Sequence, residues 1–180
     1  HVRSRRQRQM CIRDSAGTVA AAVVTRLLGG KTDIVMMLNG ALAGLVAITA
    51  EPLTPSPVLA IVIGAIGSLI MYFGTKFLES KKIDDVVGAI PVHMFAGIFG
   101  TLVVPISNPD TNFGTQLTGV IAVCLFSFIL SYITFRVLKQ TIGLRISAQA
   151  EKLGTDVAEV GVKAYACLLY TSDAADDSLR

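Results

Sequence analysis

The chain has 180 residues, 52% of them hydrophobic, and its mean hydropathy of +0.62 is too high for an ordinary soluble domain. The formal net charge is +3, but six of the sixteen Lys and Arg and four of the thirteen acidic residues lie outside residues 16–166. The central region therefore carries a net charge of only +1 and gives no electrostatic basis for a nucleic-acid partner.

The two ends, residues 1–15 and 167–180, are interpreted as adapter-derived and non-native. Residues 5–15 read RRQRQMCIRDS and residues 167–176 read CLLYTSDAAD. Both peptides are explained by translating the two strands of one sequencing-adapter oligonucleotide. Such cloning scars carry no fold information, so we expect neither end to pack in a native core and the chain between them to be a fragment. The alternative for the first end is a basic arm that binds nucleic acid or anionic lipid.

Between these ends the apolar residues fall into long blocks with few or no charges. Because roughly 20 apolar residues span the hydrocarbon core of a bilayer, the blocks predict membrane-spanning helices. The expected spans lie at residues 16–28 (partial), 34–50, 58–78, 86–106 and 117–138. We expect an all-α fold, a polytopic transmembrane helix bundle over residues 16–138, with a tail over residues 139–166. Fully buried helices of a soluble protein would need flanking amphipathic helices, which the pattern lacks.

The positive charges of the central region alternate between the two sides of this bundle. All ten Lys and Arg lie near residue 30, near residue 80, or from residue 136 onward, and the connections at 51–57 and 107–116 contain none. The positive-inside rule places the basic ends in the cytoplasm. We therefore expect a multi-pass protein of the cell membrane (inner or plasma) with a cytoplasmic C-terminus.

His93 is the only ionisable residue within the span at 86–106. An ionisable group in hydrocarbon costs several kcal/mol unless it faces a partner or a cavity, so it is a functional hypothesis by default. Imidazole can donate or accept a hydrogen bond and titrates near neutral pH. α-Helical spacing places Ala89 and Gly97 on the same face, where small residues would leave room for a narrow pore. The alternative is a neutral histidine satisfied inside the bundle.

Other residues of the spans suggest structural roles. Asp84 and Asp85 precede the His93 helix and are expected to cap its free amides, with a direct functional role as the alternative. Cys124 is a lone thiol in an apolar run and behaves as a small hydrophobe, so the sequence predicts no metal site and no cofactor. Closely spaced glycines are expected to let helix backbones approach one another: Gly40 and Gly44, Gly64 and Gly67, Gly97 and Gly100.

Three blocks, in order, resemble the C-terminal half of the ammonium transporter (Amt/Mep/Rh) family, and the similarity covers residues 16–166. They are NGALAGLVAIT at 39–49, IDDVVGAIPVHMFAGIFG at 83–100, and GLRIS at 143–147 with Glu151, Gly154, Asp156, Ala164 and Tyr165 after it. The resemblance implies the last five of eleven spans, in a homotrimer whose subunits each have their own pore.

The same resemblance implies that His93 is the second of two paired pore histidines, the first lying in the absent half. The implied function is transmembrane transport of ammonium/ammonia through a hydrophobic pore, without enzymatic activity. The implied partners are the lipid bilayer and a PII-type signalling protein at the tail. Two alternatives stay open, an ammonium sensor or transducer of the same fold and an unrelated polar-solute channel. An integral-membrane enzyme would need several ionisable groups or a metal cluster.

Overall fold

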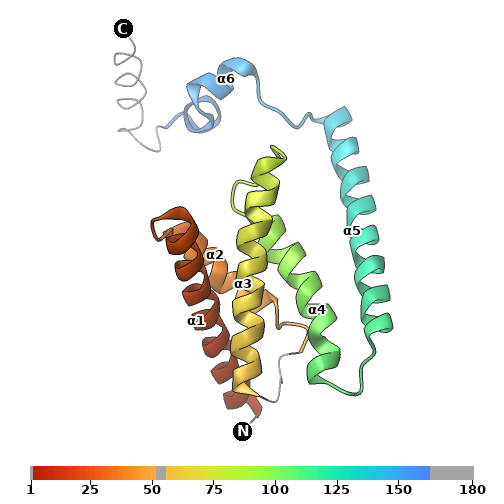
Figure 1. Cartoon of the computed structure of the whole chain (residues 1–180). Coiled ribbons are helices and arrows are strands. Elements are labelled where there is room, and N and C mark those ends of the chain that lie inside the picture. The colour runs from red at the N-terminus through yellow and green to blue at the C-terminus, as the bar shows by residue number, and fades with distance from the viewer. Residues whose placement is uncertain (1, 52–55, 163–180) are drawn as a thin grey trace. The chain divides into compact units, whose positions relative to one another are not determined.

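The computed structural model describes residues 2–51 and 56–162, and every regular element in that part of the chain is a helix (Figure 1). The elements are α1 (Val2–Gly29), α2 (Ile34–Val46), α3 (Pro57–Ser80), η1 (Ile90–Phe95), α4 (Ala96–Ser107), α5 (Phe113–Thr141), α6 (Ala148–Leu153) and η2 (Asp156–Val160). Both η segments are π-helical. The chain divides into two compact units, His1–Leu125 and Phe126–Arg180. The all-α expectation is confirmed for the described residues.

In the first unit α1, α2 and α3 pack against one another, and η1 and α4 lie against α2 and α3 (Figure 1). The short helix α2 and the turn that follows it are central to the core, because each contributes to one of the two buried clusters. One cluster joins Ala43 to Met71, Val92 and Ala96, and the other joins Ala47 and Ile48 to Ala60 and Ile63. Small residues on α2 therefore let α1, α3 and the segment η1–α4 come close to it.

Three glycines lie where helix backbones meet, as the glycine spacing predicts. A Cβ on Gly40 would lie 2.6 Å from Ala21 Cβ, and a Cβ on Gly67 would lie 2.6 Å from Ala47 Cβ. A Cβ on Gly100 would run into the carbonyl oxygen of Ala47. No side chain fits at these positions unless the helices separate, so the packing role of these glycines is confirmed.

Three described helices are long and apolar enough to cross a membrane: α3, the combined segment Ile90–Ser107, and α5. The helix in the span expected at residues 34–50 is shorter than predicted, because α2 ends at Val46 and the chain continues in turns through residue 50. Thr49 contributes to this ending, since both its amide and its hydroxyl donate to the carbonyl of Val46, at 3.1 and 2.8 Å. Such local side-chain bonds compete with the helical pattern.

α1 is longer than the partial span expected at residues 16–28. Its 28 residues begin at Val2 and include most of the segment interpreted as adapter-derived. Arg, Gln and Met are good helix formers, so local propensity favours a helix there. Ile12 is half-buried and Cys11 is exposed, so the part of this end whose side chains are described is partly packed rather than free of the bundle as expected. The other end, residues 167–180, lies outside the described residues.

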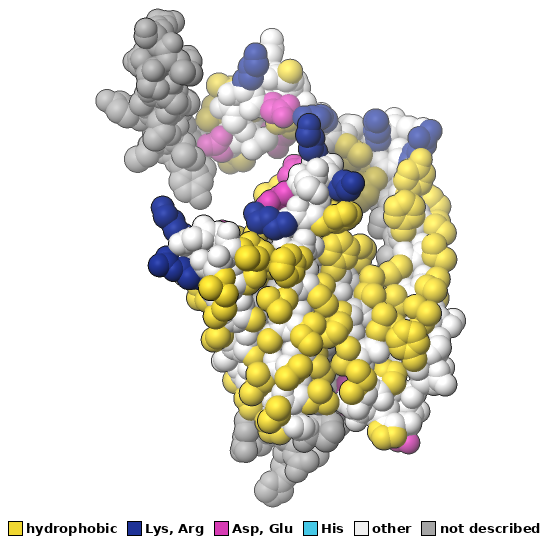
Figure 2. All heavy atoms as spheres, viewed as in Figure 1, with side chains coloured by type: hydrophobic (Ala, Val, Ile, Leu, Met, Phe, Trp, Pro, Cys, Tyr) yellow, Lys and Arg dark blue, Asp and Glu magenta, His cyan; other side chains and the backbone are white. Residues whose placement is uncertain are grey.

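The basic side chains described in the first unit are distributed unevenly along it. Its described Lys and Arg side chains gather at one end of the helices (Figure 2). They belong to the α1–α2 turn and the end of α3: Arg26, Lys31, Lys76, Lys81 and Lys82. The described parts of the two connections at the other end carry Glu51 and Asp110 but no Lys or Arg, whereas the basic end also carries Asp33, Glu79, Asp84 and Asp85. The alternation predicted from the loops is therefore present in the fold.

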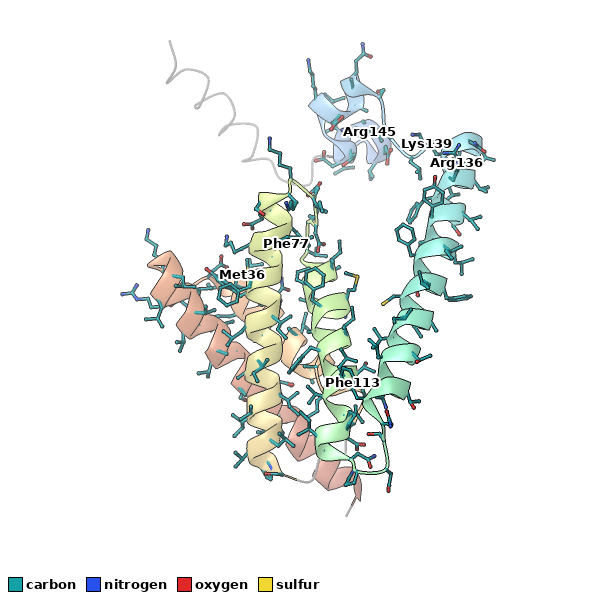
Figure 3. All side chains as sticks on the ribbon, turned by 45° about the vertical axis from the view of Figure 1, so that its right-hand side comes forward. Met36, Phe77, Phe113, Arg136, Lys139 and Arg145 are labelled. Atoms are coloured by element: carbon teal, nitrogen blue, oxygen red, sulfur yellow. The ribbon has the colours of Figure 1, made fainter. Side chains whose placement is uncertain are left out.

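The second unit contains the rest of α5 and the helices of the tail. No residue of α5 is buried, and its basic residues Arg136 and Lys139 lie near its C-terminal end, opposite Phe113 at its start (Figure 3). In the tail, Ser147 Oγ accepts a 3.1 Å hydrogen bond from the Ala150 amide and so caps α6. Arg145 forms a 3.2 Å ion pair with Glu151. The GLRIS block thus builds the beginning of a short helix.

Candidate functional site: a histidine on an apolar groove

His93 lies in η1, a π-helical turn that opens the long segment Ile90–Ser107. Pro91 has no amide hydrogen to donate to the preceding turn. Its carbonyl oxygen accepts a hydrogen bond from the amide of Ala96, five residues further on, which is the π-helical spacing. Pro91 and Val92 are buried against the bundle, whereas His93 and Met94 are exposed. The turn therefore anchors one face in the core and presents the imidazole on the other. Single π turns occur often at functional sites.

The start of this turn is held by the carboxylate of Asp85. Its Oδ1 accepts a 2.9 Å hydrogen bond from the amide of Ala89, and its Oδ2 accepts a 2.8 Å bond from the amide of Ile90. The amides at a helix start otherwise lack partners, and a negative charge there also favours the helix dipole. The capping expected of the aspartate pair is thus made by Asp85, next to the exposed Asp84.

His93 lines a groove of about 390 Å³ that lies within the first unit. The end of α2, the segment η1–α4 and the first part of α5 form its walls. The lining residues are Val46, Thr49, His93, Met94, Gly97, Ile98, Thr101, Gly119, Val120, Val123 and Cys124. The surface is mainly apolar or glycine backbone, interrupted by an imidazole, a thiol and two hydroxyl groups.

Both hydroxyl groups in the groove donate to a nearby backbone carbonyl of their own segment. Thr101 donates to the Gly97 carbonyl at 2.9 Å, and Thr49 donates to the Val46 carbonyl at 2.8 Å. His93 is therefore the group in this lining best suited to exchange a proton or a hydrogen bond with a small molecule. Within the described residues, no group of three or more His, Cys, Asp and Glu is placed to hold a metal ion.

The structure brings together His93 and Gly97 but leaves Ala89 out of the groove. Ala89 is exposed and is not among the lining residues. The prediction used α-helical spacing. A π turn instead bonds residue i to residue i+5, so the residue four positions before His93 no longer lies directly beside it. Pro91 two residues before His93 was the sequence signal for this irregularity. Met94 and Thr101, which the sequence did not single out, line the groove instead.

Comparison with known proteins agrees with this arrangement. Residues 11–165 match the Ammonium Transporter Family. The chain is 38% identical over 171 residues to the ammonium transporter Amt2 of Archaeoglobus fulgidus, covering 84% of this chain and 36% of that protein. The chain thus spans little more than a third of that relative. The match begins at residue 11 and so does not separate residues 11–15 from the rest.

Solved structures show the same fold. A Sensor Amt Protein superimposes with a TM-score of 0.77 at 32% identity, covering 84% of this chain and 40% of that one. Candida albicans Mep2 superimposes with a TM-score of 0.72 at 23% identity, covering 85% and 38% of the two chains, which supports the fold alone. The class is thus a helical membrane protein with several apolar helices. The chain belongs to the ammonium transporter family, whose members are transporters and not enzymes.

Proposed function

We propose that this chain is the C-terminal part of a membrane protein that conducts ammonium as ammonia, with His93 in the conduction pathway. The observation that carries the proposal is the position of His93, whose imidazole faces an apolar groove in a chain of this family. The exposure of His93 and Met94 also fits a surface that another part of the full-length protein would cover.

The physics of an apolar pathway favours ammonium over other monovalent cations. K⁺ and Na⁺ cannot lose their charge, and the transfer of an unpaired charge into an apolar medium is very costly. Ammonium can lose a proton outside the pore and enter as a neutral molecule. A neutral imidazole carries one N–H donor and one acceptor nitrogen, so His93 can bind ammonia or pass on a proton. A second histidine, from the part of the protein beyond this chain, would complete the relay.

The orientation we propose follows from the charge distribution. The end of the first unit that carries Lys and Arg is cytoplasmic, as are α6 and η2, which follow the basic end of α5. The tail motif forms a capped helix with an ion pair, which suits an element that docks on another surface, such as a PII-type protein. We further propose that the full-length protein is a homotrimer with one pore in each subunit.

A second candidate function is ammonium sensing by the same fold. It is favoured by the similarity to the Sensor Amt Protein, which at 32% identity is comparable to the transporter relatives. A sensor would bind ammonium and signal without net flux. Its pore site would resemble that of a transporter, so the difference lies in conduction.

Flux and binding measurements on the full-length protein separate the two functions. We expect the protein to restore growth of transporter-deficient cells on low ammonium. In proteoliposomes we expect saturable ammonium uptake above that of empty vesicles. Ammonium binding without flux in the same vesicles would favour the sensor, and the absence of both binding and flux would contradict the proposal.

A further inference from the structure

The chain between α3 and η1 is attached to α2 by one side chain, Asn39. Its Nδ2 donates a 3.1 Å hydrogen bond to the carbonyl oxygen of Val87, 48 residues further along the chain. Asn39 is half-buried in the second turn of α2. A side chain of a core helix therefore binds the backbone of the connection that leads into the His93 turn.

The residue after Val87 is fitted to this contact. Gly88 has φ +73°, in the left-handed region that residues with a Cβ adopt only at a cost. A Cβ on Gly88 would lie 2.9 Å from Asn39 Nδ2. Gly88 is buried, and glycine there both permits the turn and lets the amide of Asn39 approach.

This attachment acts on the start of the helical segment that carries His93. The carbonyl of Gly88 accepts a hydrogen bond from the Val92 amide at 3.2 Å, and the Asp85 carboxylate accepts from the amides of Ala89 and Ile90. Asn39 therefore fixes the peptide from which the first turn of the segment is built. The Gly88–Val92 bond links this peptide to the residue directly before His93, so a shift of the Val87–Gly88 backbone is passed on to the turn that carries the imidazole.

We propose that Asn39 is a positioning residue, which sets the direction of the His93 imidazole through the Val87–Gly88 backbone. The proposal rests on the proposed conduction role of His93. The hydrogen-bond donor matters here, whereas the size of the side chain does not. Asn39→Asp, which keeps the shape but removes the NH₂ group, therefore has the same effect as Asn39→Ala.

The test uses the full-length protein in proteoliposomes, with ammonium flux and K⁺ flux measured per assembled protein. Asn39→Ala and Asn39→Asp are expected to lower ammonium flux at least about tenfold or to reduce its selectivity over K⁺ by a similar factor, since a misplacement of ~1 Å can cost ~100-fold. The matched control is Asn108→Ala. The Asn108 amide also makes a long-range 3.1 Å bond, to Glu51 Oε2, in connections on the other side of the bundle. Asn108→Ala is expected to lower the melting temperature similarly while flux and selectivity stay within about twofold of wild type.

Gly88→Ala provides a second route to the same contact if the Asn39 variants assemble poorly. It should lower flux on its own and cost less in the Asn39→Ala background, where the opposing amide is absent. The inference is overturned if Asn39→Ala, Asn39→Asp and Gly88→Ala lose no more flux or selectivity than Asn108→Ala while His93→Ala loses conduction. If His93→Ala itself conducts normally, the proposed function fails first, and the positioning role fails with it.

Discussion

Ser68 Oγ donates a 2.8 Å hydrogen bond to the carbonyl oxygen of Gly17, and this buried bond joins α3 to α1 across 51 residues of chain. Gly40 of α2 lies at the same point, because a Cβ there would be 2.7 Å from Ser68 Oγ and 2.8 Å from the Gly17 carbonyl oxygen. Three helices thus meet at two glycines and a serine. In lipid, where apolar side chains gain little from association, this close packing and the hydrogen bond hold the bundle together.

Substitutions at this junction should distinguish the stability contributed by the hydrogen bond from that contributed by the close packing. Ser68→Ala is expected to cost about 1 kcal/mol of stability, the usual value for an interhelical hydrogen bond in membranes. Gly40→Ala should cost more, about 1–3 kcal/mol, because the new methyl group overpacks the junction. Denaturation of the full-length protein in detergent measures both, with Ser131→Ala on the exposed surface of α5 as the control. Equal stability of all three variants would show that the junction contributes nothing.

The contact of α4 with the end of α2 gives a second matched pair. A Cβ on Gly100 would collide with the Ala47 carbonyl, whereas one on Gly119 would meet nothing within 4 Å. Gly100→Ala should therefore destabilise the protein by about 1–3 kcal/mol. Gly119→Ala should be neutral or stabilising by up to about 1 kcal/mol, since alanine favours helix. Thermal unfolding of the two variants side by side checks this, and the reverse order would contradict the packing described for α4.

The two aspartates before η1 provide a third pair. Asp85→Ala removes two accepted hydrogen bonds at a helix start and is expected to cost about 1 kcal/mol, within the range for lost N-caps. Asp84→Ala removes an exposed carboxylate and should have a smaller effect. Hydrogen exchange at the amides of Ala89 and Ile90 measures the local effect. Faster exchange in Asp84→Ala than in Asp85→Ala would show that Asp85 is not the capping residue.

The proposed orientation is tested by labelling the two ends of α3. Its 24 residues rise about 36 Å, enough to cross the hydrocarbon core. In a full-length protein without other cysteines, Ser56→Cys should react with an impermeant maleimide added outside the cell. Ser80→Cys should react only in inverted vesicles. Reaction of both from the same side would rule out α3 as a membrane span.

Sequence alone placed the long helices well, because blocks of uncharged apolar residues determine where a chain can cross a bilayer. It also identified Asp85 as a cap and Gly40 and Gly100 as packing positions, since these roles follow from local spacing. It did not predict that α2 ends at Val46, where turn bonds of Thr49 take over from the helix.

The candidate site was only partly predictable for a related reason. His93 was identified because it is the only ionisable residue in a long apolar block. Ala89 does not line the groove, because a π turn beside Pro91 changes the spacing and its occurrence depends on tertiary packing; its place in a pore stays a prediction. Asn39 was part of a recognised block but had no assigned role, since a hydrogen bond over 48 residues cannot be read from periodicity.

The most direct measurement of the central claim is ammonium and K⁺ uptake by the full-length protein carrying His93→Ala or His93→Glu. Uptake is compared in transporter-deficient cells at equal amounts of assembled protein, with Leu130→Ala on exposed α5 as a control for losing a large side chain. His93→Ala is expected to lower ammonium uptake about a hundredfold, the lower range for loss of a positioned proton-transfer group. His93→Glu is expected to keep uptake but admit K⁺, because a carboxylate balances the charge of a bare cation. Wild-type uptake and selectivity in both variants would contradict the account and leave His93 as a histidine of structural importance only.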